Sequence, residues 1–402
     1  MYHSDRKKDM NILHLPSWFP NRHFSTSGLF TKKHIESLAS LPGTNHIVIT
    51  WQDTRYATLR NPLAFFRSLI RSLKKPRKLK KGNVEYIVVD LFQSSELIFG
   101  SNARRLENTL VRQALDVVRK QSISLVHAHV AYPGGYVAMR VAEETGVPYV
   151  LTEHMGPFPL YEYRTPPEWL DERIIQPVQR CKTIVAVSRF HAGQIKSWTG
   201  RDPVVIPNVV DSLEFAPDLQ PRQRNYFQFV SVSRFVVQKG VDTLLSAVSL
   251  LKKTGETQFR ICICGEGPLE TELKQLCTRL ELDRQVEWVD GFDRKAVASR
   301  IRSCDCLVSS SRWESFGVTL VEALACGKPV IATRSGGPED FVNEQNGMLV
   351  DIDDGNALAA AMGEMITHAG RYSPHAIRED CLRRFSPEVV ARRYATEVYE
   401  IQ

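Results

Sequence analysis

Short apolar runs alternate along the chain with longer segments of helical periodicity. In the first half, six runs have strand length and many β-branched residues: NILHLP, HIVITW, VEYIVV, SLVHAHV, PYVLTEH and TIVAVS. Six runs of the second half share these features: FQFVSVS, RICICG, VEWVDG, CLVSSS, PVIAT and GMLVD. Intervening segments such as GYVAMRVAEETG have apolar residues at helical spacing. Strands that alternate with helices predict α/β domains, in which helices cover both faces of a parallel sheet.

The composition changes between these two sets of runs, at residues 207–225. This segment, PNVVDSLEFAPDLQPRQRN, holds three prolines and has no clear periodicity, which is typical of a linker. We therefore expect two Rossmann-like, doubly wound domains, at 1–208 and 209–385, that face each other across a cleft. The final segment, 386–402, has a Ser-Pro-Glu start and an apolar stripe. It predicts a helix that could pack on either domain, including back on the first.

The composition is that of a globular protein. Of the 402 residues 43% are apolar, and no apolar run reaches the roughly 18–20 residues of a membrane-spanning helix. The N-terminus has too short an apolar core for a signal peptide, and residues 1–9 predict either a disordered extension or a misplaced start, with Met1 and Met10 both open as the first residue. Eight cysteines without a signal peptide favour the reducing cytoplasm. Two C-x-C pairs, in RICICG and SCDCLV, lack the C-x2-C spacing of zinc sites and are expected to be buried apolar side chains.

The net charge of +7 is concentrated in residues 54–82, which hold ten basic residues and no acidic one. Apolar residues recur at helical spacing from Leu63 to Leu73, and RKLKK follows Pro76. A basic amphipathic helix is typical of an anionic membrane surface, so residues 63–81 are a candidate for peripheral binding at the inner face of the plasma membrane. A core-facing helix with a solvated basic face is the alternative. Nucleic-acid binding is not expected, because the interleaved aromatic residues that it favours are missing.

The stretch WESFGVTLVEALACGKPVI is apolar nearly throughout but carries Glu314 and Glu322, eight positions apart. The strand CLVSSS precedes it, so Glu314 lies in the loop at that strand's carboxyl end, and a helix that starts near Gly317 carries Glu322. Amides at this helix N-terminus form a site for an anion, and glycine lets backbone approach the anion closely. These amides belong to Phe316, Gly317 and Val318. A helix capped by serine with two solvated glutamates is the alternative, which the apolar neighbours disfavour.

The E-x7-E pattern, followed by ALACGKPVIAT, resembles the signature of retaining GT-B glycosyltransferases of family 4, the glycosyl transferases group 1. Further segments also resemble that family, so the resemblance covers nearly the whole chain. They are VSVSRFVVQKGVDTLLSAV, CICGEGPLETELKQL, PSWFPNRHFSTSGLF, and VHAHVAYPGG with VLTEHMG. The resemblance implies two Rossmann-like domains. It also implies transfer of a sugar from a nucleotide-diphosphate donor to an acceptor hydroxyl with retention of configuration.

The resemblance implies roles for several residues of the second half. Arg234 and Lys239 would neutralise the departing diphosphate, a task that suits fixed positive charges. Glu322 would accept hydrogen bonds from the ribose hydroxyls, and Glu314 would contact the transferred sugar. Loop and helix-start residues would complete the donor site: Gly265, Gly267, Phe292, Phe316, Gly317 and Val318.

In the first half, Gly28 matches the family's glycine loop, whose amides meet the diphosphate, although Ser27 stands where many members have a second glycine. His154 matches the family's active-site histidine near the donor sugar, and a structural role is the alternative. His127 and His129 lie two residues apart on one strand face and are either acceptor-side or structural. No third ligand is evident beside them, so no metal site is expected.

Two segments resemble other kinds of site. Asp351 and Asp353 have the D-x-D spacing of a metal motif, but they come late and directly before a helix, which predicts helix capping. GEGPLE has only part of the dinucleotide motif G-x-G-x-x-G, so a dehydrogenase is not expected.

We therefore expect a retaining, metal-independent hexosyltransferase. Its catalytic residues would be His154, Glu314, Arg234 and Lys239. Its partners would be a UDP- or GDP-linked sugar and a glycan or lipid-linked acceptor, in the assembly of a bacterial-type cell-surface polysaccharide or glycolipid, and no cofactor is expected. The alternatives are a non-catalytic binding protein of the same fold and a sugar-nucleotide epimerase. The sequence leaves the sugar, the base, the linkage and the oligomeric state open.

Overall fold

The computed structural model describes residues 9–21, 28–53, 75–91, 101–160, 164–165, 169–218, 224–291 and 293–401. Contacts divide the chain into two compact units. Unit 1 consists of residues 1–187, 192–206 and 391–402, and unit 2 of residues 188–191 and 207–390. The main part of the second unit therefore begins at Pro207, and the last twelve residues belong to the first. Phe292 and residues 63–74 of the basic segment lie outside the described residues.

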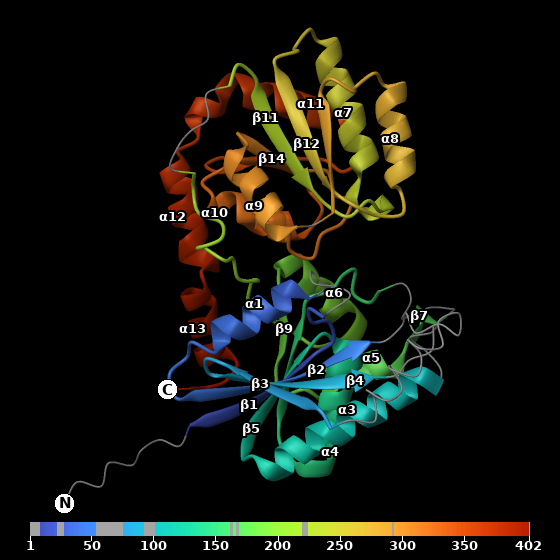
Figure 1. Ribbon diagram of the computed structural model, residues 1–402, viewed down its shortest axis with the longest axis vertical. Helices are drawn as coiled ribbons and strands as arrows, with labels where there is room; N and C mark the ends of the chain where they lie inside the picture. The colour runs from blue at the N-terminus through green and yellow to red at the C-terminus, as the bar shows by residue number, and fades with distance from the viewer. Residues whose placement is uncertain are drawn as a thin grey trace, which may run out of the picture. The chain divides into compact units, whose positions relative to one another are not determined.

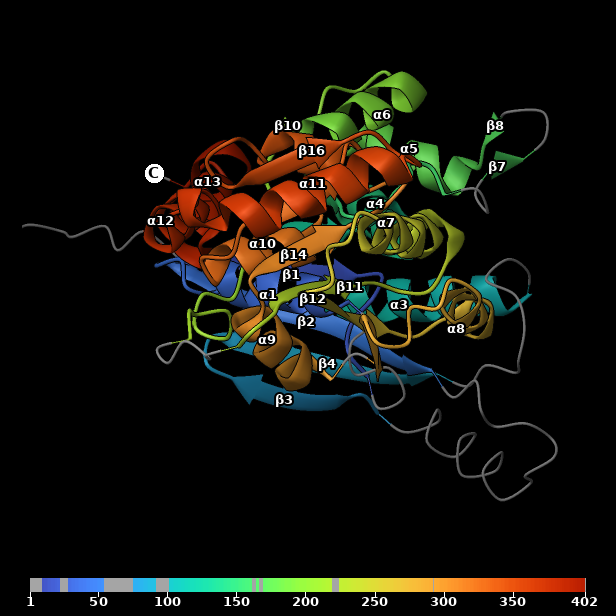
Figure 2. The same cartoon turned by 90° about the horizontal axis from the view of Figure 1, so that it is seen from above.

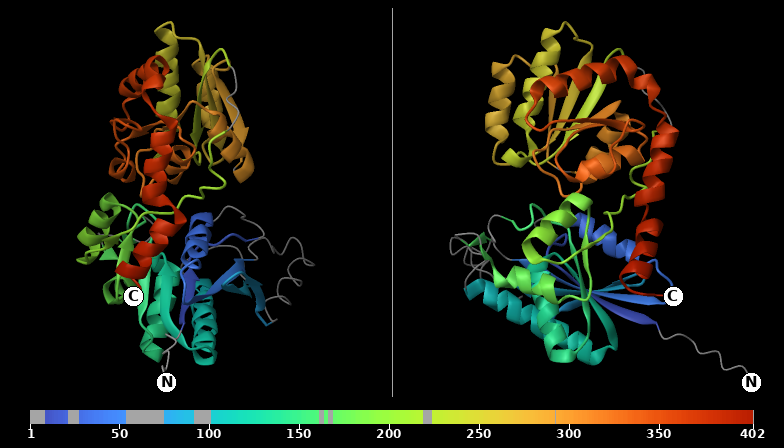
Figure 3. Two further views of the ribbon diagram at one scale, coloured as in Figure 1. Left: turned by 90° about the vertical axis from the view of Figure 1, so that its left-hand side faces the viewer. Right: turned by 180° about the vertical axis from the view of Figure 1, so that it is seen from behind.

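Unit 1 is built on an eight-stranded sheet with the strand order β10-β9-β6-β5-β1-β2-β4-β3. The strands are β1 Met10–Pro16, β2 Thr44–Asp53, β3 Arg77–Lys81, β4 Val84–Leu91, β5 Ile123–His129, β6 Tyr149–Glu153, β9 Ile184–Ala186 and β10 Val204–Val205. All neighbours are parallel except β3, which runs antiparallel to β4 at the sheet edge. Figure 2 shows β3 as the outermost strand of this sheet, and Figure 3 shows how the strands fan out, as the twist of a sheet requires.

Helices cover both faces of this sheet. They are α1 Leu29–Leu38, α3 Ser101–Lys120, α4 Tyr136–Thr145, α5 Glu172–Arg180 and α6 Arg189–Thr199. Between β5 and α4 lies the one-turn helix η1 Ala131–Gly135, and β7 Arg164–Thr165 pairs with β8 Trp169–Leu170 as a separate hairpin. Alternate strand residues such as Leu13 and Val126 point into a large apolar core with α3, α4 and α5. The residues between them point to the opposite face, where α1 packs.

Unit 2 is built on a six-stranded parallel sheet with the order β13-β12-β11-β14-β15-β16. The strands are β11 Phe227–Val232, β12 Phe259–Gly265, β13 Val286–Asp290, β14 Cys306–Ser309, β15 Val330–Thr333 and β16 Gly347–Val350. Numbered within the unit, this order is 3-2-1-4-5-6, that of dinucleotide-binding sheets. The strand order reverses between β11 and β14, and ligands of such sheets bind beyond the carboxyl ends of the strands at that point.

The helices of unit 2 are α7 Val241–Lys253, α8 Glu270–Arg279, α9 Arg294–Ser303, α10 Val318–Ala325, α11 Gly355–His368 and α12 Pro374–Phe385. Short 3-10 turns lie at η3 Val237–Lys239, η4 Gly337–Asp340 and η5 Ala369–Arg371, and α13 Pro387–Glu397 ends in unit 1. Helices α7, α8 and α11 form one layer, and α9, α10 and α12 lie on the other side of the sheet (Figure 1).

The predicted α/β fold with two parallel-sheet domains is confirmed. All eight cysteines are buried thiols, as the strand-like surroundings of the C-x-C pairs predicted. The cap of α11 is Asp354, whose carboxylate accepts the Ala357 amide at 2.8 Å. Asp351 and Asp353, the D-x-D pair, instead form ion pairs with Arg334 and Arg312. None of the helices in the described part of the chain has the length and hydropathy of a membrane span.

Candidate active site

Two predicted residues of unit 2 meet where the strand order reverses. Lys239 ends the turn after β11, and Glu314 lies in the loop after β14. The Lys239 ammonium donates to Glu314 Oε1 at 2.6 Å, and the Ser311 hydroxyl donates to the same oxygen at 2.7 Å. Only 21% of the lysine side chain and 15% of the glutamate side chain are exposed. The pair therefore forms a half-buried, charge-assisted contact at the ligand-binding edge of the sheet.

The loops after β11 and β14 come this close because glycine stands at position 240. Gly240 has φ +58°, and a Cβ atom there would lie 2.2 Å from the carbonyl oxygen of Ser310. The Ser310 hydroxyl donates back to the Lys239 carbonyl at 3.1 Å. A side chain at Gly240 would thus force apart the two loops that carry Lys239 and Glu314.

Arg234 lies on the same β11 loop and is exposed. Its guanidinium forms no ion pair with any residue that the structure describes. Its positive charge can therefore interact with a ligand at the carboxyl ends of the strands. The nearby Gly265 and Gly267 allow the loop after β12 to pack on the β11 loop. A Cβ atom at Gly265 would lie 2.0 Å from Ser233 O, and one at Gly267 would lie 2.6 Å from Phe235 O. Contact with protein backbone therefore suffices to explain why these two positions are glycine.

The predicted helix start at Gly317 is present. Gly317 is the N-cap of α10 with φ +95°, and Val318 is the first helical residue. Phe316 is buried between the rings of Phe341 and Phe385, at centroid distances of 5.4 and 5.7 Å. The phenyl ring of Phe316 is thus committed to the core, and only its backbone amide can serve a ligand.

Glu322 lies on α10 and is 7% exposed, so neither predicted glutamate is a solvated surface residue. Its Oε1 accepts from Arg294 Nη1 at 3.2 Å, while Arg294 Nε donates to Glu214 Oε2 at 2.5 Å. Burial raises the pKa of Glu322 to about 7, against the opposing influence of the Arg294 charge. The guanidinium between two carboxylates holds Glu322 in one orientation.

In unit 1, the predicted residues Gly28 and His154 lie close to the same helix start. Gly28 is the N-cap of α1 with φ +65°, and a Cβ atom there would lie 2.2 Å from the carbonyl oxygen of Trp18. The ring of Phe30, two residues further on, lies 5.2 Å from the ring of His154. His154 follows β6 directly and is buried. The N-terminus of α1 and the imidazole therefore form one cluster.

The residue before His154 is itself unusual. Glu153 is buried, and its carboxylate accepts the amides of Ala131 at 2.8 Å and Met155 at 2.9 Å. Burial raises the pKa of Glu153 to about 7, although these backbone hydrogen bonds lower it. The carboxyl group thereby ties the loop that carries His154 to the turn after β5.

His127 and His129 on β5 are fully buried, with ring centroids 4.2 Å apart. His127 Nδ1 lies 2.6 Å from the Tyr399 hydroxyl, and its Nε2 lies 2.8 Å from Thr152 Oγ1. Both nitrogens of His127 are therefore occupied by protein groups, which favours the structural alternative for this residue.

The two histidines of β5 belong to a larger group. His14, His34, His46 and His154 lie beside them on the same face of the sheet, with ring centroids within 6.1 Å of a neighbouring histidine. Among the residues that the structure describes, His14, His127 and His129 each offer a ring nitrogen within 4.8 Å of the others, the spacing of a possible metal site. These nitrogens already form hydrogen bonds within the protein, as described for His127 above and for His14 and His129 below.

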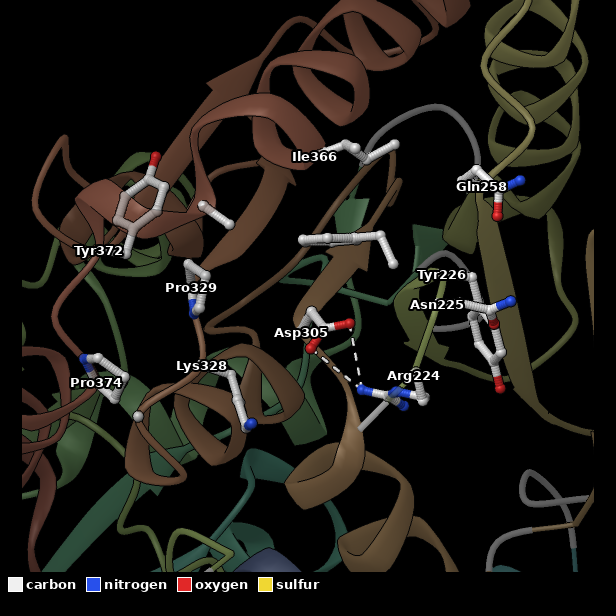
Figure 4. A pocket seen from close by; sticks show the side chains of 13 residues that line it. Arg224, Asn225, Tyr226, Gln258, Asp305, Lys328, Pro329, Ile366, Tyr372 and Pro374 are labelled. Atoms are coloured by element: carbon white, nitrogen blue, oxygen red, sulfur yellow. Dashed lines mark hydrogen bonds and ion pairs between the residues drawn. The ribbon is translucent and has the colours of Figure 1, made fainter. Parts of the chain in front are cut away.

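A pocket of about 620 Å³ lies at the opposite edge of the unit 2 sheet, beside the amino ends of β11 and β14. Figure 4 shows its lining, in which Arg224 reaches the carboxylate of Asp305. The two side chains form hydrogen bonds of 3.1 and 3.2 Å, and Asp305 also accepts the Gln228 amide at 2.7 Å. Arg224 and Asp305 are thus paired with each other, and none of the predicted site residues lines the pocket.

Sequence reasoning missed several residues of these clusters. Arg294 and Ser311, which orient Glu322 and Glu314, are ordinary in sequence and gain their roles only through the fold. His14 and His46 left a signal, because each interrupts an apolar strand at a position that faces away from the main core.

Two family models match the chain. Residues 80–212 match Glycosyltransferase Family 4, and residues 216–379 match Glycosyl transferases group 1. The first range lies almost wholly in unit 1 and the second in unit 2, so each unit is recognised separately.

Individual relatives agree with these models. An uncharacterized glycosyltransferase of Methanocaldococcus jannaschii is 28% identical over 254 residues, 63% of this chain and 68% of that protein. A Bacillus subtilis glycosyltransferase named for teichuronic acid biosynthesis, TuaC, is 24% identical over 372 residues, 88% of each chain.

Solved structures show the same fold at lower identity. Sucrose-phosphate synthase from Thermosynechococcus elongatus has a TM-score of 0.76 at 18% identity, over 98% of this chain and 99% of that one. Anabaena HepE in complex with UDP-glucose has a TM-score of 0.70 at 20% identity, over 98% of this chain and 100% of that one. Both are GT-B proteins in fold, and the two family models together cover most of the chain. The chain therefore belongs to the glycosyl transferases group 1, glycosyltransferase family 4, and it is a glycosyltransferase with the GT-B fold.

Proposed function

We propose that the protein is a retaining hexosyltransferase that moves a sugar from a nucleotide-diphosphate donor to an acceptor hydroxyl. The observation that carries this proposal is a set of charged side chains at the switch point of unit 2, the place between β11 and β14 where the strand order reverses. There, the open charge of Arg234 lies on the same loop as Lys239, which contacts Glu314 at 2.6 Å. This set offers cations for two phosphates and a carboxylate for a sugar hydroxyl.

The chemistry of the leaving group indicates what the two cations would do. When the bond between the sugar C1 and the diphosphate oxygen breaks, negative charge develops on that oxygen, and fixed cations stabilise it. Arg234 and Lys239 supply such charges, and the amides at the N-terminus of α10 add a partial positive charge. Because protein cations neutralise the diphosphate, we propose that no divalent metal is required.

Glu322 suits the ribose of the donor. A carboxylate can accept hydrogen bonds from two vicinal hydroxyls, and Arg294 holds this carboxylate in place through the contact at 3.2 Å. A ribose that displaces Arg294 from one oxygen would leave the guanidinium paired with Glu214.

Retention follows if attack and departure use the same face of the sugar. The acceptor oxygen forms its bond to C1 on the face from which the diphosphate leaves, and the acceptor proton passes to the departing phosphate oxygen. Atoms and charge balance without a protein nucleophile. Glu314 would position the sugar rather than bond to it, since its carboxylate is already held by Lys239 and Ser311.

In unit 1, we propose that His154 contacts the donor sugar and that the α1 amides beyond Gly28 face the diphosphate. Both groups are brought together around Phe30. The donor base stays open between uridine and guanosine. Because HepE was solved in complex with UDP-glucose, UDP-sugars are the first donors to test.

The acceptor is proposed to be a glycan or a lipid-linked glycan of a cell-surface polymer. TuaC, whose match covers 88% of this chain, is named for teichuronic acid biosynthesis, and that name supports this choice. We further propose that the protein works in the cytoplasm at the inner membrane face and binds anionic lipid through its basic edge. Strand β3, RKLKK, supports this, because all five of its residues are exposed. No nucleic-acid partner is proposed.

The decisive variant is Arg234→Ala. Because Arg234 is exposed and forms no ion pair with a described residue, its removal should leave the melting temperature unchanged. Transfer with a UDP- or GDP-sugar should fall about 100-fold, as for removal of one transition-state charge stabiliser. Lys253→Ala, an exposed lysine of α7, is the matched control and should keep full activity. Unchanged transfer by Arg234→Ala would contradict the proposed role of the switch-point charges.

A further inference from the structure

Four histidines and a threonine form an unbroken line of hydrogen bonds in unit 1, which we call the histidine line. Thr44 Oγ1 lies 2.9 Å from His46 Nε2, and His46 Nδ1 lies 2.8 Å from His14 Nε2. His14 Nδ1 lies 3.1 Å from His129 Nε2, and His129 Nδ1 lies 3.3 Å from His154 Nε2. The line crosses the sheet from β2 through β1 and β5 to the loop after β6 and ends at the predicted sugar-binding histidine.

Every imidazole in the line is buried. Burial lowers the pKa of His14 and His129 well below the ordinary value and that of His46 to about 4, so these rings are neutral at physiological pH. A neutral imidazole has one N–H donor and one acceptor nitrogen. A line of neutral rings must therefore point its protons in one direction along its whole length.

Thr44 determines that direction. Its hydroxyl lies 2.7 Å from the carbonyl oxygen of Leu41, and a carbonyl can only accept, so the one hydroxyl proton is used there. Thr44 Oγ1 must then accept a proton from His46 Nε2. His46 Nδ1 is consequently the acceptor for His14 Nε2–H, and the same assignment repeats at His129.

At the end of the line, His129 Nδ1 accepts from His154 Nε2–H. His154 therefore donates from Nε2–H, and the nitrogen that can accept a hydrogen bond in its neutral form is Nδ1. We propose that Thr44 and the three intervening histidines are positioning residues that fix this tautomer, so that His154 accepts a hydrogen bond from a donor-sugar hydroxyl. The sugar contact rests on the function proposed above, whereas the tautomer rests on the hydrogen bonds alone.

The cluster also contains a control for the line. His127 bonds to Thr152 Oγ1 at 2.8 Å, and Thr152 bonds to the Tyr394 hydroxyl at 2.9 Å. These bonds lie beside the line and share no histidine with it. Thr152→Val thus removes a buried threonine hydroxyl from the same cluster without touching the line.

The test uses full-length protein labelled with 15N-histidine, whose nitrogen shifts distinguish protonated from unprotonated positions. His154 is assigned by the signal missing in His154→Asn. In the wild type we expect protonated Nε2 and unprotonated Nδ1 at His46, His14, His129 and His154. In Thr44→Val, His46 Nε2–H would face a methyl group, and an unpaired buried N–H is costly. The line should reverse and move the His154 proton to Nδ1.

Thr44→Ser and Thr152→Val should keep the wild-type tautomer of His154. The transfer reaction should change in the same variant. The donor KM of Thr44→Val should rise about tenfold, a factor that corresponds to the free energy of one hydrogen bond. Both controls should stay within about twofold, a change too small to represent a lost hydrogen bond.

Three results would overturn the inference. They are Nδ1-protonated rings in the wild type, an unchanged His154 tautomer in folded Thr44→Val, and a zinc ion retained through gel filtration with shifted His14 and His129 signals. The wild-type spectrum decides the direction of the line even if Thr44→Val does not fold. Absent transfer with the expected nitrogen signals would support the line and count against the proposed function alone.

Discussion

At the residue scale, Glu322 shows how the fold sets the properties of one carboxyl group. The side chain is 7% exposed and pairs with Arg294, which also pairs with Glu214. Because burial raises its pKa to about 7, the folded protein binds this proton more tightly than the unfolded chain does. Ionisation of Glu322 therefore costs stability, and that cost grows as the pH rises from about 4.5 to about 7.

Glu322→Gln removes this titration while keeping the shape of the side chain. Relative to the wild type, the variant should gain free energy of unfolding between pH 5 and pH 8, by about 1–3 kcal/mol. Urea denaturation at the two pH values measures that difference. Glu364→Gln, at an exposed carboxyl of α11, is the control and should show no such gain. A pH-independent difference for Glu322→Gln would contradict the raised pKa.

At the scale of elements, β3 is the strand on which the proposed membrane contact depends. It is an exposed, antiparallel edge strand with four basic residues, three of which pair with acidic side chains of β4 and α1. These pairs are exposed and worth little, so they do not prevent the lysines from turning to a membrane. Charged edge strands also resist pairing with other chains, and this second role needs no lipid.

The two roles of β3 are separable by experiment. Replacing Lys75, Lys78, Lys80 and Lys81 by glutamine should abolish sedimentation with vesicles that contain anionic phospholipid, because each basic residue near such a surface contributes about 1 kcal/mol. Binding by the wild type should weaken as salt is raised. A control with the same number of changes at Lys252, Lys253, Lys274 and Lys295 of unit 2 should still bind. Wild-type protein that stays in the supernatant at low salt would refute the membrane proposal and leave only the edge-protecting role.

At the scale of the whole molecule, the sequence predicted the two units and their sheets because strand and helix periodicities are local signals. The twelve apolar runs correspond to β1, β2, β4, β5, β6 and β9 in unit 1 and to the six strands of unit 2. The basic edge strand β3 was not predicted, because RKLKK has no apolar alternation and all five of its residues are exposed.

The candidate site was predictable only in part. Glu314 and Lys239 are 75 residues apart, and their contact at 2.6 Å depends on a strand order that periodicity does not encode. The histidine line was out of reach for the same reason, because it joins β1, β2 and β5 through their register. The family resemblance indicated which residues would act on the donor, and the structure showed the side chains that orient those residues.

The central claim is that this protein transfers a sugar with retention of configuration. The most direct measurement is the anomeric proton coupling of the product, followed by NMR while purified protein acts on nucleotide-diphosphate sugars with a glycan acceptor. We predict a new glycosidic bond with the anomeric configuration of the donor, formed equally well in the presence of EDTA. An inverted product would contradict this claim. So would conversion of the donor sugar without an acceptor, as an epimerase would show, or the absence of both transfer and hydrolysis with every donor, as a binding protein would show.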